Sequence, residues 1–254
     1  MIVDSLNNFC PIDLSEMSAI KLMNRIDTKY LTNVRFIPEL LEKATASYRA
    51  QVIENNPVAL YRTLYYDTAD MEMYVMHHNR KLQRQKVRTR TYLSSADLSF
   101  LEIKNKTNKG RTKKKRIEIS PENFFDFRLD QNAVAFLHSH SAYNSGVLLP
   151  QLANQFERIT LVNNDKTERL TIDYNLCFEN KTTGKSIALP DIAIIELKQD
   201  GLCHSQFKDF LLEARIKPKS ISKYCLGTIL TNENVKKNRF KRKLVFLDKT
   251  INEL

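Results

Sequence analysis

The sequence VRTRTY, from Val87 to Tyr92, decides the fold class because its residues alternate with period two. In an extended chain Arg88, Arg90 and Tyr92 share one face, and the intervening residues share the other. This pattern predicts a β-strand whose two faces differ in polarity. The polar face of this strand is cationic.

The same alternation recurs in five further segments, where charged residues oppose Leu or Ile. These segments are 101–106, 114–119, 158–161, 169–173 and 195–198. Between the predicted strands lie segments with the character of helices, namely 35–47, 70–82, 121–128, 204–214 and 220–230. The mixture predicts an α+β fold.

The charged strand faces allow two interpretations. In one, each charged face meets water in a sheet that helices cover on the other side. However, most of these charges are Lys or Arg, and like charges on neighbouring strands repel one another. A bound polyanion would offset the repulsion, and closing the sheet would direct the cations into one lumen with helices outside. We therefore expect an antiparallel β tunnel that holds a polyanion.

The composition agrees with an anionic partner. The chain has 254 residues, with 40 Lys and Arg against 29 Asp and Glu, which gives a net charge of +11. Such a charge favours nucleic acid, phosphate polymers, nucleotides or an acidic membrane surface. Only 5 glycines and no low-complexity tract are present, so we expect a single domain over 1–254 that ends in a basic C-terminal tail.

Cysteine spacing and hydropathy predict the cellular compartment. The four cysteines show no CxxC spacing, and the N-terminus shows no signal-peptide pattern, so we expect a reduced, cytoplasmic protein. No apolar stretch is long enough to cross a bilayer. The basic run 236–243 is predicted to be solvated, with peripheral contact at the inner face of a membrane left open.

Eight short motifs, in their order along the chain, carry a family resemblance. They are RIDTKY (25–30), YRTLYYDT (61–68), RTRTY (88–92), EIK (102–104), KKR (114–116), RLTID (169–173), ELK (196–198) and SKY (222–224). Over about residues 20 to 230 the chain resembles the VTC domains of the triphosphate tunnel metalloenzyme superfamily. The resemblance implies an eight-stranded antiparallel β tunnel with a polar, basic lumen covered by helices. It also implies that the protein polymerises polyphosphate from a nucleoside triphosphate such as ATP.

The resemblance further implies which residues act. Glu196 corresponds to the family's metal ligand, for Mn²⁺ or Mg²⁺, while Glu102 and Asp173 either join the metal shell or neutralise cations beside them. One departure is Arg25-x-Asp27-x-Lys29, where many tunnel enzymes have Glu-x-Glu-x-Lys, and it disfavours a simple triphosphatase. The cations implied to grip phosphate are Lys29, Arg62, Arg88, Arg90, Lys104, Lys114, Arg116, Arg158, Arg169, Lys198 and Lys223.

We therefore expect a metal-dependent polyphosphate polymerase that binds nucleoside triphosphate and polyphosphate. A separate membrane protein would be needed to move the polymer across a membrane. Two alternatives stay open: a tripolyphosphatase or nucleoside triphosphatase, and a non-catalytic protein that binds polyphosphate or inositol phosphates. Nucleic-acid binding is disfavoured because no recognition helix, zinc finger or aromatic stacking platform is found.

Overall fold

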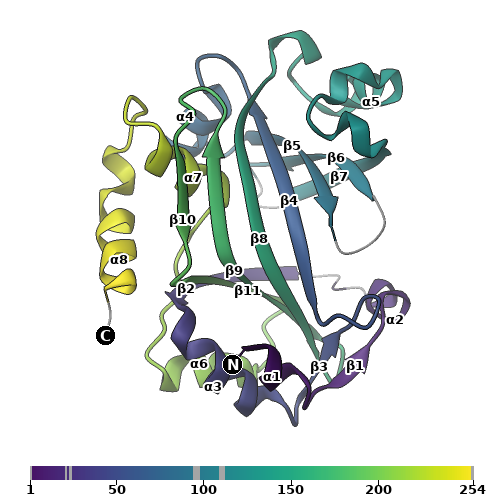
Figure 1. Ribbon diagram of the computed structural model, residues 1–254, viewed down its shortest axis with the longest axis vertical. Helices are drawn as coiled ribbons and strands as arrows, with labels where there is room; N and C mark the ends of the chain where they lie inside the picture. Colours follow the sequence, from purple (N-terminus) through teal and green to yellow (C-terminus); the bar gives the residue numbers. More distant parts are fainter. Residues whose placement is uncertain (1, 21, 23–24, 94–97, 109–111, 253–254) are drawn as a thin grey trace.

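The protein is built around a curled antiparallel sheet, as a computed structural model shows for residues 2–20, 22, 25–93, 98–108 and 112–252 (Figure 1). Eight strands follow one another in the order β2-β11-β9-β8-β4-β5-β6-β7, and every neighbouring pair is antiparallel. Their bounds are β2 Arg25–Asn33, β4 Val58–Asp67, β5 Arg84–Tyr92, β6 Ser99–Lys106, β7 Thr112–Ile119, β8 Leu149–Asn163, β9 Glu168–Asn180 and β11 Ile192–Asp200. The predicted α+β fold with an eight-stranded antiparallel sheet is confirmed.

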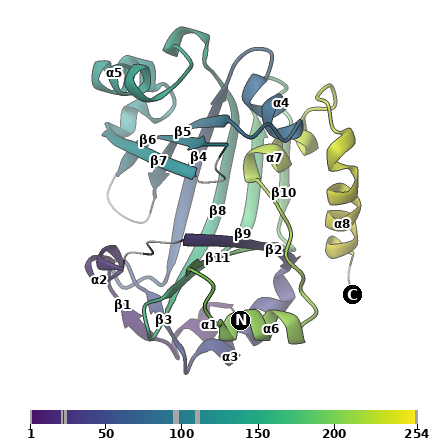
Figure 2. The ribbon, with the colours of Figure 1, turned by 180° about the vertical axis from the view of Figure 1, so that it is seen from behind.

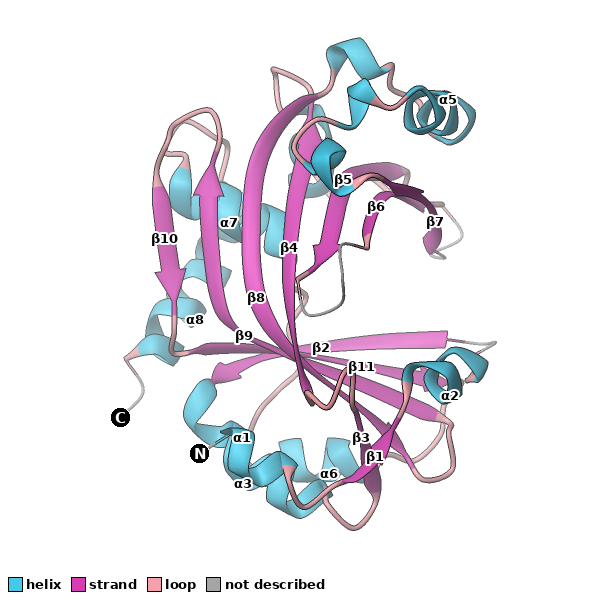
Figure 3. Ribbon diagram, turned by 45° about the vertical axis from the view of Figure 1, so that its right-hand side comes forward, coloured by secondary structure: helices cyan, strands magenta, loops and turns pink. Residues whose placement is uncertain are grey.

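The sheet forms a half-barrel with β2 and β7 as the outer strands of this order (Figure 3). Three short strands extend it: β3 (Tyr48–Gln51) pairs with β8 and with β1 (Cys10–Ile12), and β10 (Ser186–Leu189) pairs with β9. The register between β8 and β9 shifts at Gln155–Glu157. Such bulges bend the strands and increase their twist, which helps the long central strands to curl.

Helices cover the outer side of the curled sheet. Helices α3 (Ile37–Ala44) and α6 (Gln206–Glu213) pack beyond β2 and β11, and α5 (Gln131–His140) lies beyond β5, β6 and β7 (Figures 2 and 3). The buried strand residues under these helices alternate with the charged ones; Val87 and Leu197 are examples. The charged residues that alternate with these buried ones, such as Arg88 and Lys198, therefore lie on the inner face of the half-barrel.

One end of the inner face is apolar because α7 (Lys223–Thr231) packs directly on it. The helix approaches the sheet at Gly227, where a Cβ atom would lie 2.6 Å from Leu152 Cδ2 and even closer to the ring of Phe178. Only glycine allows this close approach. Lys223, the first residue of α7, is thereby held beside the charged part of the inner face.

Several elements differ from the sequence prediction. The segment 121–128 contains two 3₁₀ turns, Pro121–Phe124 and Phe127–Leu129, because Asp126 between them is extended (φ −148°). Helices α1 (Ile2–Leu6), α2 (Leu14–Ala19), α5 and α8 (Lys241–Ile251) were not predicted, and the predicted helix 70–82 is the shorter α4 (Glu72–His78).

The basic run 236–243 leads into α8 through the 3₁₀ turn Asn238–Phe240. Phe240 and Leu247 are buried, and the Asn33 side chain of β2 donates a hydrogen bond to the Thr250 carbonyl at 2.9 Å. The segment is therefore folded against the body of the protein through its apolar residues, while Lys236, Arg239, Lys241 and Arg242 of the basic run are exposed. In the described part of the chain, no helix has the length and apolar character that crossing a membrane requires.

Candidate functional site

Three carboxylates on the inner face each lie between two cations. The first is Glu102 on β6, which is fully buried. Arg88 of β5 is its cross-strand neighbour, and Arg88 Nη2 lies 2.6 Å from Glu102 Oε2. Lys114 of β7 contacts the other carboxylate oxygen. Although burial opposes ionisation, the Arg88, Arg90 and Lys114 charges hold the pKa of Glu102 well below its usual range.

The second carboxylate is Asp173 on β9. Arg158 lies directly opposite on β8 and makes two bonds to it, at 2.5 Å from Nε and 2.7 Å from Nη2. Lys223, at the start of α7, contacts the same carboxylate. The two cations keep the pKa of Asp173 low despite the opposing effect of burial.

The third carboxylate is Glu196 on β11. Lys29 lies opposite it on β2 and contacts Oε1, while Lys198 Nζ lies 3.2 Å from Oε2. Each of the three groups therefore has two basic side chains against one carboxylate. We call them the Glu102, Asp173 and Glu196 clusters.

Further cations lie on the inner face without a carboxylate of their own. Arg90 Nε donates to Thr63 Oγ1 at 3.1 Å, and the described residues form no ion pair with Lys104. The charge of Arg88, and then burial, hold the pKa of Lys104 well below its usual range. Burial is the largest cause that lowers the pKa of Lys114 to about 8 and of Lys223 to about 7. The inner face thus has an excess of crowded positive charge.

Two aromatic rings lie beneath several of these cations and were not predicted as part of the site. Tyr61 and Phe156 stack with their centroids 5.3 Å apart. Arg158 Cζ lies 4.7 Å from the Tyr61 centroid and 5.2 Å from the Phe156 centroid. Lys223 Nζ lies 4.3 Å from the Phe156 centroid. Ring faces attract cations, so this pair fixes the direction of the two side chains. No sequence signal marked Phe156, because the predicted strand began two residues later.

Lys86 is another inner-face cation that the sequence prediction missed. It shares the face of Arg88 and Arg90 and donates a hydrogen bond to Ser222 Oγ at 2.7 Å. The alternation in 87–92 extends backwards to residue 86, so this signal was present in the sequence.

Arg62 is not brought together with the other predicted cations, whereas Arg169 lies on the inner face opposite Lys198 of β11 but directs its guanidinium elsewhere. Arg62 pairs in register with Thr91 and Gln155, so it lies on the face opposite to Tyr61 and its cation cluster. Arg169 Nη2 donates to the carbonyls of Met17 and Ile20, at 3.1 Å and 3.3 Å, and so holds the end of α2. Arg116 lies on the inner side of β7 with its guanidinium 4.5 Å from the Phe100 ring.

The three predicted metal ligands differ in how accessible they are to a metal ion. Glu102, Asp173 and Glu196 each contact two cations, and the described residues contain no group of three His, Cys, Asp or Glu side chains suited to a metal. Mg²⁺ is commonly held by one carboxylate with phosphate oxygens and water. Glu196 best fits that mode because its side chain is 18% exposed, against 0% for Glu102 and 2% for Asp173.

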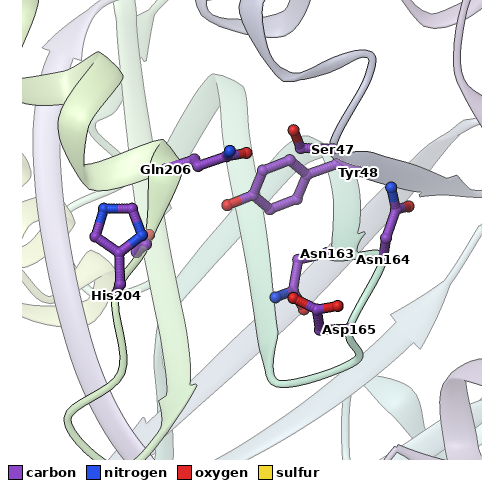
Figure 4. A pocket seen from close by; sticks show the side chains of 8 residues that line it. Ser47, Tyr48, Asn163, Asn164, Asp165, His204 and Gln206 are labelled. Atoms are coloured by element: carbon purple, nitrogen blue, oxygen red, sulfur yellow. The ribbon is translucent and has the colours of Figure 1, made fainter.

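A polar pocket of about 300 Å³ lies away from the inner face, where β3, the β8–β9 turn and the start of α6 meet (Figure 4). Its lining includes Tyr48, Asn163, Asp165 and His204, but no Lys or Arg. A polyanion would find little positive charge there. None of the predicted site residues lines this pocket.

Two solved structures are similar to this chain at low sequence identity. Among solved structures, the PH1819 protein from Pyrococcus horikoshii OT3 is similar at 12% identity over 81% of this chain and 98% of that chain, with a TM-score of 0.43. The hypothetical protein NE1496 is similar at 12% identity over 80% and 96%, with a TM-score of 0.29. These two likenesses are too distant to indicate a function. No curated protein matches the chain.

The model of the VTC domain family matches residues 24–232. This range holds all eight motifs on which the resemblance rests and most of the inner face. The chain therefore belongs to the VTC domain family and is a polyphosphate-related protein.

Proposed function

We propose that this protein is a metal-dependent polyphosphate polymerase that transfers the γ-phosphate of ATP to a growing polyphosphate chain on its inner face. The observation that carries the proposal is the charge ratio of the three clusters. Each of the three carboxylates is shared by two cations, and Arg90 and Lys104 lie beside them without a carboxylate of their own. Uncompensated buried charge is costly, so the arrangement favours a bound polyanion.

A phosphate chain matches the arrangement of these cations. Arg presents a planar fork that binds phosphate through two bonds, whereas Lys acts as a point charge. Arg88 and Arg90 follow one another on the inner face of β5, and Arg158 lies on β8, beyond the intervening strand β4. Lys104, Lys114 and Lys198 lie on the same inner face. Arg90 and Arg158 are close enough for the charge of each to affect the other. Consecutive phosphate groups could therefore be gripped by neighbouring side chains.

In the proposed reaction, a terminal oxygen of the growing chain attacks the γ-phosphorus of ATP. The bond between that phosphorus and the bridging oxygen breaks, and ADP leaves with the electron pair. The protein's contribution is to align the two oxygens and to surround the transferred group with positive charge. Glu196 would hold Mn²⁺ or Mg²⁺, which supplies additional charge stabilisation when bound.

The test is incubation of the purified protein with ATP and Mn²⁺ or Mg²⁺, followed by separation of the products by chain length on a gel. Long chains that need metal support a polymerase. Orthophosphate alone would indicate a hydrolase. Arg88→Ala and Lys223→Ala should lose synthesis, whereas Arg62→Ala, on the opposite face, is the matched control. Synthesis at the parent rate by the first two variants would contradict the proposal.

A non-catalytic polyphosphate-binding protein is the second candidate. It is favoured by the contacts of Glu196, because Lys29 and Lys198 engage both of its oxygens. Tight binding of polyphosphate without metal and without turnover would support this candidate. In either case we propose a cytoplasmic protein, with a membrane protein as the partner that moves the polymer.

A further inference from the structure

A second cationic site lies outside the inner face, at the seam between the end of α4 and the start of α8. It is a pocket of about 330 Å³ lined by Arg80, Asn238, Arg239 and Arg242. Within the described ranges, no carboxylate forms an ion pair with any of these three arginines. Three guanidinium groups with no carboxylate partner around one hollow are suited to phosphate groups.

The seam is a packed structure that fixes where the arginines stand. The Phe240 ring packs against the rings of Tyr74 and His78, with centroids 6.2 Å and 5.3 Å away. Tyr74 donates a hydrogen bond to the Lys236 carbonyl at 2.7 Å, and the Arg239 amide donates to His78 Nε2 at 3.3 Å. Arg239 and Arg242 are therefore held against the end of α4, where Arg80 lies.

Arg80 occupies a backbone position that favours glycine. Its φ is 59°, and the amides of Arg80 and Lys81 donate to the carbonyls of His77 and Met76 at 3.1 Å and 3.0 Å. This is the Schellman motif that ends many helices, and glycine is its usual residue at this point. Arginine therefore occupies a position where the backbone conformation would favour glycine.

Two lysines, Lys86 on the inner-face strand β5 and Lys243 on α8, interact electrostatically, and Lys243 also interacts with Arg80 of this pocket. Burial lowers the pKa of Lys243, and the charges of Arg80 and Lys86 lower it further. Lys243 Nζ also lies 5.2 Å from the centroid of the Phe240 ring, the ring that packs this segment against α4. His77 lies in the same region: burial lowers its pKa to about 2, with further contributions from Lys86, Arg84 and Lys243. A chain of phosphates that leaves the inner face past Lys86 would meet Lys243 and then the pocket.

We infer that Arg80, Arg239 and Arg242 form a second phosphate-binding site, which holds the distal part of a phosphate chain that extends from the inner face. The inference rests on the proposed binding of polyphosphate by the inner face. The inference adds the direction in which the phosphate chain leaves the inner face. It also adds a second site that only long phosphate chains can reach.

The structure offers a closely matched control for Arg80. Arg215 ends α6 in the same Schellman motif, with φ 57° and amide bonds from Arg215 to Leu212 and from Ile216 to Leu211 at 2.9 Å and 2.7 Å. Arg80→Gly and Arg215→Gly therefore remove the same charge and relieve the same backbone conformation at two distant places (Figure 1).

The experiment measures the affinity of the wild type and variants for tripolyphosphate and for long-chain polyphosphate by calorimetry at one ionic strength. We expect Arg80→Gly to weaken long-chain binding about 3- to 10-fold, and the triple variant with Arg239→Gln and Arg242→Gln by about 30-fold or more. Tripolyphosphate, which we expect to occupy the inner face alone, should bind all variants within about twofold of the wild type. Arg215→Gly should change neither affinity.

Three results would overturn the inference. The first is equal weakening of long-chain binding by Arg80→Gly and Arg215→Gly, which would indicate a general charge effect. The second is unchanged long-chain binding by the triple variant. The third is a triple variant that keeps polyphosphate binding but loses binding to vesicles of phosphatidylcholine and phosphatidylserine, which would assign the pocket to lipid headgroups. Failure of the wild type to bind tripolyphosphate would instead count against the proposed function of the inner face.

Discussion

Replacing Lys223 by Arg should remove much of the pH dependence of tripolyphosphate binding between pH 7 and 9. Burial lowers the pKa of Lys223 to about 7, although Asp173 opposes the shift. In the free protein the amine is then protonated about half of the time at pH 7 and about one time in a hundred at pH 9. A bound phosphate favours the charged amine, so this group alone can weaken binding by up to ~50-fold over that range. Arg stays protonated and should lack this loss.

Calorimetric titrations of wild type and Lys223→Arg at pH 7, 8 and 9 test this expectation. Tripolyphosphate's own ionisation affects both proteins equally, so the difference between their slopes isolates Lys223. Parallel slopes would refute the reasoning. Stability offers a second readout. Because the pKa of Lys223 is lower in the folded protein, the unfolded chain binds more protons above pH 7, and stability without ligand should rise with pH in the wild type.

Three further predictions concern single substitutions. Asp173→Asn leaves two buried cations without their carboxylate, so chemical denaturation should show a loss of about 3–5 kcal/mol, partly restored by tripolyphosphate; a loss below about 1 kcal/mol would contradict this. Gly227→Ala forces a methyl group against the ring of Phe178 and should lower stability by about 1–3 kcal/mol, with Phe178→Leu relieving part of the loss in thermal melts. Arg90→Ala should weaken tripolyphosphate binding by about tenfold, whereas Arg62→Ala, on the opposite face, should change it less than about twofold; equal effects would show that face assignment is irrelevant.

The local pattern of the sequence was sufficient to predict six of the eight strands of the main order, and which side chains share a face within each of them. Period two is a property of the extended backbone itself, so the alternation at Arg88 and Arg90, and at Glu102 and Lys104, already assigned these side chains to one face. The order of the motifs identified the family, which the match over residues 24–232 confirmed. The face on which Arg62 lies could not be predicted from the pattern alone. Tyrosines stand at both kinds of position in β4, so nothing local told which face was the inner one.

Other features depended on segments distant in sequence. Helix α8 was not predicted because its basic residues resemble a solvated tail. The burial of Phe240 and Leu247 against other elements shows that this segment is folded. The short helix α7 is held to the sheet by a contact that only Gly227 permits.

The sequence by itself determined that this protein has a cationic sheet face and belongs to a polyphosphate-related family, because strand alternation and motif order are local or linear properties. Only the tertiary structure decided which charges meet. Asp173 joins Arg158 and Lys223 because strand pairing places β8 beside β9 and the close packing of α7 brings in a residue 50 positions away. Likewise, Arg80 and Arg242 share one pocket because Phe240 anchors the segment before α8 to α4. Ion pairs depend on distances of a few ångströms, and chain folding alone sets such distances between remote residues.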